Sequence, residues 1–128
     1  MKARAPLFWM VAAIAALTVM SGIVQILWPA EILRYISGSQ TPASLHFFGL
    51  VGMFMALFGG ALLNALFATG DNKIVVVWAG LQKFGAVAGV AIGVWHGVFS
   101  ALALLVAGFD FLSALVIFGY LLKPDWRP

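Results

Sequence analysis

Two charged side chains that are suited to chemistry, Lys83 and Asp110, each lie inside apolar sequence long enough to cross a membrane. They stand at equal distances on either side of His96-Gly97, so a helical turn there would place both at the same depth. An unpaired charge near the middle of a bilayer costs about 2.5–3.5 kcal/mol, so each charge is expected to have a partner. The spacing therefore predicts an ion pair between Lys83 and Asp110, formed directly or through Gln82 or water.

This pair allows three interpretations. It could be a buried salt bridge that fixes the register of packed helices. It could be a polar centre in a cavity that carries protons or binds the polar head of a ligand. It could also contact a helix of a partner protein. Gln82, Ser113 and Asn64 complete the candidate polar centre, the first two as support for the pair and Asn64 as a hydrogen-bonding group between helices.

The composition predicts an integral membrane protein. The 128 residues are 64% hydrophobic and only 9% charged, whereas soluble domains contain about 25% charged residues. A single domain over residues 1–128 is expected, with the lipid bilayer as its solvent. The seven Lys and Arg residues form no basic run, which argues against nucleic acid as a partner. Since the chain has no cysteine, disulfides, thiolate metal sites and iron-sulfur clusters are excluded.

The apolar segments predict an all-α, antiparallel four-helix bundle. The expected spans are about 7–28, 44–68, 73–95 and 98–122, each long enough for a hydrocarbon core of roughly 30 Å. As one helix, residues 74–122 would measure about 73 Å, so the chain must turn back near His96-Gly97. A short interfacial helix is expected to start at Pro29 in the linker.

The first span has a competing interpretation as a signal peptide, because Lys2 and Arg4 precede it. Its apolar run is longer than the central region of such peptides, which favours a retained helix.

The basic residues predict the orientation. With four spans, Arg34 stands alone on one side, and the other side carries Lys2, Arg4, Lys73, Lys123 and Arg127. The positive-inside rule then predicts that both termini are cytoplasmic.

Each span has one face of small or polar residues, which is expected to point inward. The third span has Gly85, Gly89 and Gly93 at four-residue spacing, which predicts a helix-packing face. Gly60 lies on the corresponding face of the second span, and the first span carries Thr18 and Gln25. Gln25 is expected to form a hydrogen bond between helices. The glycine face could instead contact a lipid tail, a quinone or another subunit.

No residue pattern indicates catalysis. The chain has no nucleophile elbow, phosphate-binding loop or paired-carboxylate site. His46 and His96 could approach each other and ligate haem or copper, but no third ligand is evident, so no metal or cofactor is predicted. Enzymatic activity of its own is therefore not expected.

Several short motifs are similar to a known family. They are Trp28-Pro29, Phe48-Gly49-Leu50, Phe58-Gly59-Gly60, Gly80-Leu81-Gln82-Lys83 and Phe109-Asp110-Phe111-Leu112. In these the chain resembles the small four-helix bacterial membrane proteins of the DoxX and DoxX-like type. The resemblance implies a multi-pass protein of the bacterial cytoplasmic (inner) membrane. Some members of this group are small subunits of quinone-linked oxidoreductases and many have no assigned activity, so the resemblance supports the fold and not a reaction.

Three functions are therefore expected, in order. The first is a non-catalytic accessory or assembly subunit of a larger membrane complex, in contact with lipid and with other subunits or copies of itself. The second is a DoxX-like subunit of a quinone-linked oxidoreductase that binds a quinone or lipid near Lys83, Gln82 and Asp110. The third is a small carrier or proton pathway that uses Lys83 and Asp110.

Overall fold

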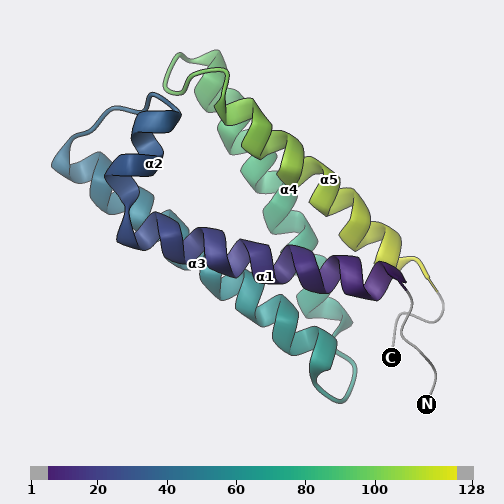
Figure 1. The fold of residues 1–128 in the computed structure, drawn as a ribbon. Helices are drawn as coiled ribbons and strands as arrows, with labels where there is room; N and C mark the ends of the chain where they lie inside the picture. The colour runs from purple at the N-terminus through teal and green to yellow at the C-terminus, as the bar shows by residue number, and fades with distance from the viewer. Residues whose placement is uncertain (1–5, 124–128) are drawn as a thin grey trace.

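The computed structural model describes residues 6–123 and is helical, with no strand among these residues. Four of its helices are long and apolar enough to cross a membrane, which confirms the predicted all-α architecture of four spans. The helices, shown in Figure 1, are α1 (Pro6–Leu27), α2 (Pro29–Tyr35), α3 (Pro42–Phe67), α4 (Lys73–Trp95) and α5 (Ala103–Leu121).

The helix boundaries follow local sequence signals. Pro29 begins α2 as expected. Thr41 caps α3 reciprocally with Ser44: the Thr41 hydroxyl oxygen accepts from the Ser44 backbone N–H (3.0 Å), and the Ser44 hydroxyl accepts from the Thr41 N–H (2.9 Å). α4 ends next to Gly97, whose φ of +73° is left-handed backbone that glycine adopts at little cost.

The fourth span begins later than predicted, at Ala103 rather than at residue 98. Residues 96–102 form a loop, because after His96 the backbone N–H groups leave the helical i to i−4 pattern. The Ser100 N–H, for example, donates to the carbonyl of Ile36 at 2.8 Å, in the segment that follows α2.

The long helices form two antiparallel pairs. α1 packs along α3, α4 packs along α5, and contacts between the two pairs are fewer. The pairs meet where α1 begins and α5 ends, here called the closed end, and diverge toward α2 and the 96–102 loop, here called the open end (Figure 1). The pairs are therefore packed together at one end only, whereas the sequence predicted a compact bundle with four faces turned inward.

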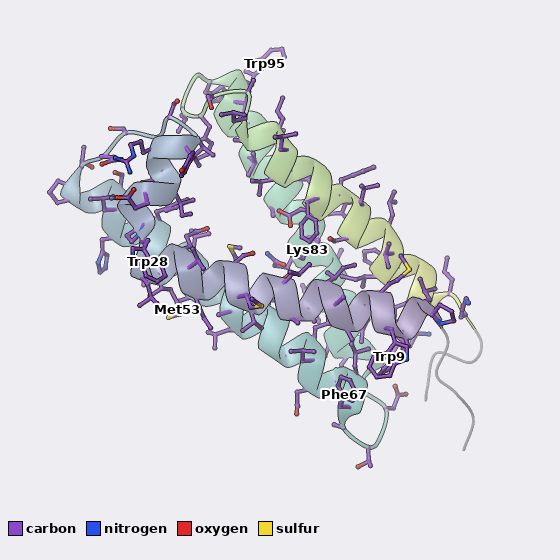
Figure 2. All side chains as sticks on the ribbon, in the orientation of Figure 1. Trp9, Trp28, Met53, Phe67, Lys83 and Trp95 are labelled. Atoms are coloured by element: carbon purple, nitrogen blue, oxygen red, sulfur yellow. The ribbon has the colours of Figure 1, made fainter. Side chains whose placement is uncertain are left out.

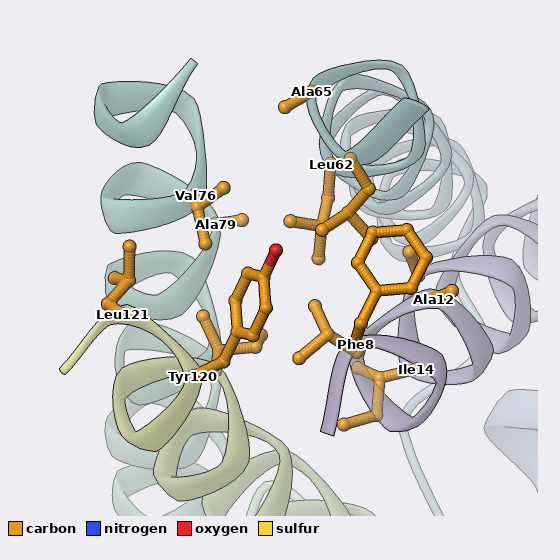
Figure 3. Close-up of a cluster of buried hydrophobic side chains, with 13 residues drawn as sticks. Phe8, Ala12, Ile14, Leu62, Ala65, Val76, Ala79, Tyr120 and Leu121 are labelled. Carbon is orange, nitrogen blue, oxygen red and sulfur yellow. The ribbon is translucent and has the colours of Figure 1, made fainter. Parts of the chain in front are cut away.

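A hydrophobic core fills the closed end. The ring of Phe8 on α1 lies 5.4 Å from that of Phe67 on α3 and 6.3 Å from that of Tyr120 on α5. Figure 3 shows Phe8 and Tyr120 among small and branched side chains, including Leu62 and Val76, which belong to the same buried cluster. The start of α1 and the ends of α3 and α5 thus share one side, as four antiparallel spans require.

The charged residues divide between the two ends. Lys73 begins α4 and Lys123 follows α5, so both lie at the closed end. Arg34 pairs with Glu31 on α2, at the open end. Lys2, Arg4 and Arg127, the other residues of the predicted orientation, lie outside the described residues.

Glycines bring α1 and α3 together, but Gly52 and Gly59 on α3 are not on the face that the sequence predicted for packing. A Cβ added to Gly59 would lie 2.8 Å from the Ala15 carbonyl oxygen, and one added to Gly52 would lie 2.7 Å from the Gly22 carbonyl oxygen. Only residues without a side chain allow backbones this close.

The predicted packing face of α4 makes no such contact within the chain. A Cβ on Gly85 or Gly89 would meet no atom within 4 Å, and one on Gly93 would lie 2.6 Å from the ring of Phe99, a loop residue. On α3, a Cβ on Gly60 would likewise meet no atom within 4 Å. Within the described part of the chain these glycines make no close helix contact, so packing of this face against lipid or another chain stays a prediction. Regular four-residue spacing along one helix does not say what that face touches.

Candidate functional site

A cluster of three buried polar side chains lies between the two helix pairs; we call Thr18, Lys83 and Asp110 the polar cluster. Lys83 Nζ donates to Asp110 Oδ1 at 3.2 Å and to Thr18 Oγ1 at 2.7 Å. The side chains of Lys83 and Asp110 are only 5% and 12% exposed. The direct ion pair predicted from the sequence is confirmed, and Figure 2 shows Lys83 in the space between the pairs.

Thr18 is the member of the cluster whose role the sequence did not predict. Its hydroxyl donates to the Ile14 carbonyl four residues earlier, at 2.8 Å, which leaves the oxygen free to accept from Lys83. At 1.5 Å per residue, Thr18 lies about 18 Å from the start of α1 and Lys83 about 15 Å from the start of α4. Both helices begin at the closed end, so matching these depths is the signal that could have paired them.

A cavity of about 350 Å³ lies beside the polar cluster, on its open-end side. Its polar lining comes from Lys83, Asp110, Gln82 and Gln25. The rest of its lining is mostly apolar and comes from α2 to α5 and the loop between α4 and α5: Ile32, Ile36, Phe48, Val51, Met55, Ala86, Gly89, Val90, Phe99, Ala103 and Val106. The cavity is thus a mostly apolar chamber with its charges at one end.

The open-end wall of the cavity is held by a backbone hydrogen bond. Ile36 and Phe99 line this wall, and the Ser100 N–H donates to the Ile36 carbonyl at 2.8 Å. The cavity also reaches the lateral surface, because its lining residues Val51 and Val106 are 52% and 49% exposed. A molecule could therefore enter from the surrounding lipid.

The remaining candidates of the polar centre occupy different places. Gln82 lines the cavity, while Ser113 is buried on α5 without lining it. Asn64 is exposed on α3 and lies away from the cavity, so its predicted place in the centre is wrong. Gln25 forms the expected interhelical hydrogen bond, with Nε2 donating to the Phe48 carbonyl at 2.8 Å, and it also lines the cavity, which the sequence did not predict.

The two histidines are exposed, His46 near the start of α3 and His96 at the end of α4. Within residues 6–123, no group of three His, Cys, Asp or Glu side chains is placed to hold a metal ion.

The polar cluster retains hydrogen-bonding capacity toward the cavity. A lysine ammonium has three N–H donors, and two of those on Lys83 are engaged. Of the two Asp110 oxygens, Oδ1 accepts from Lys83, and no hydrogen bond within the described part of the chain uses Oδ2. The ammonium also lies 5.6 Å from the centre of the Phe109 ring, within the range of a cation–π interaction. The arrangement can therefore bind a polar group.

Comparisons of the chain with protein-family models, curated proteins and solved structures gave no match. The resemblance to DoxX-type proteins stays an expectation, and functional inference rests on the geometry of the cluster and cavity.

Proposed function

We propose that this multi-pass membrane protein is a non-catalytic binding subunit that holds an amphiphilic molecule, a quinone or another lipid-like compound, in its intramembrane cavity. The observation that carries this proposal is the mostly apolar cavity whose inner end is formed by Lys83 and Asp110. Apolar walls with a few convergent polar groups are the usual design of small-molecule sites.

The size of the cavity suits part of such a molecule. Ligand pockets span roughly 300–1,000 Å³, and this one is near the lower limit. It would accommodate a head group and the first part of a tail, while the remaining tail extends through the lateral opening beside Val51 and Val106.

The cavity favours binding over a purely structural role for the ion pair. A buried salt bridge that only fixes helix register is favourable when further hydrogen bonds satisfy its remaining donors and acceptors. Here both Lys83 and Asp110 line the cavity, which leaves one side of the pair accessible to a ligand.

We also propose that the protein works as part of a larger membrane complex. A chain with short loops and a binding cavity fits an accessory subunit that presents a lipid-soluble molecule to a larger complex. The sequence favours one version of this proposal. In it, the protein is DoxX-like, the complex is a quinone-linked oxidoreductase, the location is the bacterial inner membrane, and both termini are cytoplasmic. Recovery from native membranes only as a free monomer or homo-oligomer would contradict the subunit role.

The carrier hypothesis has less support. A pathway through the protein would have to continue from the polar cluster to the closed end, where the buried core of Phe8, Leu62 and Tyr120 lies. Proton or solute flux into liposomes that is abolished by Lys83→Met would favour this alternative.

The structure provides a matched pair of variants to test binding. Gly89 lines the cavity and Gly85 does not, yet a Cβ at either position would meet no atom within 4 Å. Gly89→Leu should therefore fill the cavity with little strain, and Gly85→Leu controls for the added side chain. The protein would be extracted in polymer-bounded native nanodiscs, and the co-purified lipids and quinones quantified by mass spectrometry.

We expect a compound enriched with the wild-type protein over the surrounding membrane, lost in Gly89→Leu and retained in Gly85→Leu. Equal retention in both variants, or no enrichment with the wild type, would contradict the proposed function.

A further inference from the structure

Resting on the proposed binding function, we infer that the cavity selects molecules whose head is uncharged and forms hydrogen bonds, such as an alcohol or a carbonyl, and rejects ionised heads on the same tail. The charge balance and the hydrogen-bonding groups of the lining determine this chemical class.

The charges that line the cavity cancel. Lys83 and Asp110 contribute one charge of each sign and are paired at 3.2 Å, and the other polar lining residues, Gln82 and Gln25, are neutral. Among the described residues, the charged side chains nearest the open end, Glu31 and Arg34, are exposed, pair with each other and do not line the cavity. An anionic or cationic head would therefore enter an apolar space without a free counter-charge, and burying an unpaired charge is strongly unfavourable.

The hydrogen-bonding groups match a neutral head. The remaining N–H donor of Lys83, the Oδ2 acceptor of Asp110 and the amide of Gln82 are available at the inner end of the cavity. A hydroxyl can accept from the ammonium and donate to the carboxylate at the same time, and a carbonyl can accept from the ammonium or the amide. A pure hydrocarbon would leave these groups unsatisfied, so it should bind less well than an alcohol with the same tail.

A cavity that binds charged heads would have a different lining. A site for phosphate or carboxylate heads normally presents unpaired Lys or Arg side chains, whose charge compensates that of the ligand. Here the buried cation, Lys83, already donates to Asp110 and Thr18.

The inference can be tested with competitors that share an 18-carbon tail and carry a neutral, anionic or cationic head or none. The full chain, in nanodiscs of defined phosphatidylcholine, would be labelled with a diazirine-bearing hexadecanol, and the labelled peptides identified by mass spectrometry. Competitors would be oleyl alcohol, octadecene, oleyl sulfate and oleyl trimethylammonium, the last two being permanently charged. We expect saturable labelling of cavity-lining segments, with oleyl alcohol competing at about tenfold lower concentration than the other three.

Charge-changing variants separate head charge from head size. Asp110→Asn leaves the cluster with a net positive charge and should improve competition by oleyl sulfate relative to oleyl alcohol. Lys83→Gln leaves a net negative charge and should improve competition by oleyl trimethylammonium. Asn64→Leu removes an exposed polar group away from the cavity and should change neither ratio. The wild-type competition series requires no substitution, so it decides the inference even if a charge variant does not fold.

The outcomes distinguish a failure of the proposed binding function from a failure of the neutral-head inference. No saturable labelling of cavity segments in the wild type would contradict the proposed function itself. Saturable labelling that is competed best by oleyl sulfate, oleyl trimethylammonium or octadecene would retain a binding function and overturn the neutral-head inference. Charge variants that fold but keep the wild-type preference would also overturn it, because the preference would then not arise from the charge balance.

Discussion

Thr18 Oγ1 lies 2.7 Å from Lys83 Nζ, and this contact joins α1 in one helix pair to α4 in the other. Lys83 bonds at the same time to Asp110 on α5, so the polar cluster connects three helices in the space between the pairs (Figure 2). The cluster therefore has two consequences: it ties the two pairs together, and it forms the polar end of the cavity.

The contribution of the Thr18–Lys83 hydrogen bond to stability can be measured by removing the Thr18 hydroxyl. Thr18→Val keeps the shape of the side chain but leaves Lys83 without one of its two acceptors. We expect a loss of roughly 0.5–2 kcal/mol in the free energy of unfolding, in the range of interhelical hydrogen bonds in membranes and bonds to charged groups. Thermal unfolding in bicelles would measure it. Thr18→Ser keeps the hydroxyl and should lose less; equal losses for Val and Ser would show that the hydrogen bond contributes little.

Removing one partner of the Lys83–Asp110 ion pair should destabilise the protein more than removing both. Lys83→Met or Asp110→Leu alone leaves a buried charge without its partner, and removing one partner of a buried pair costs about 3–5 kcal/mol. The double variant removes both charges, so its stability should be closer to that of the wild type than either single variant. Unfolding equilibria of the four proteins, measured in one detergent, form the necessary cycle. If the losses of the two single variants simply added in the double variant, the two groups would not be coupled.

Much of the fold is accessible from the sequence because hydrophobic length is a strong signal in a membrane protein. The third span was predicted at 73–95, and α4 covers Lys73–Trp95. The Lys83–Asp110 pair was also predictable, because a charge inside an apolar span needs a partner. The equal spacing about His96-Gly97 was only approximate, since α5 begins at Ala103. The late start of α5 at Ala103 was not, because it depends on Ser100 bonding to Ile36, a residue far away in the sequence.

The rest of the site depends on how the two helix pairs diverge. Gln25 and Asn64 are both amides on apolar spans, yet only Gln25 lines the cavity. Gly59 and Gly60 are neighbours in one motif, yet only Gly59 contacts α1. Sequence spacing identifies the faces of each helix, but the divergence of the two pairs decides which faces meet, and that divergence is a property of the packed structure.

The predicted orientation can be tested with single cysteines, since the chain has none of its own. Ser39 lies in the loop after α2 at the open end, and Asn72 precedes α4 at the closed end; both are outside the long helices. If the closed end is cytoplasmic, Ser39→Cys should react with a membrane-impermeant maleimide in intact cells, while Asn72→Cys should react only after the membrane is opened. His96→Cys, at the open end of α4, should behave like Ser39→Cys. The reverse pattern would contradict the positive-inside prediction.

The glycine contact between α1 and α3 provides the sharpest comparison, because two adjacent residues should respond in opposite ways. In Gly59→Ala, the new Cβ would lie 2.8 Å from the Ala15 carbonyl oxygen and 2.9 Å from the Val19 nitrogen, so the helices must move apart. Overpacking of this kind costs about 1–3 kcal/mol. In Gly60→Ala, the new Cβ meets no atom within 4 Å, and alanine favours the helix over glycine by up to about 1 kcal/mol in water. We therefore expect Gly59→Ala to lower the unfolding midpoint in bicelles and Gly60→Ala to leave it unchanged or raise it. A lower midpoint for Gly60→Ala would instead indicate that this open face of α3 packs closely against another chain.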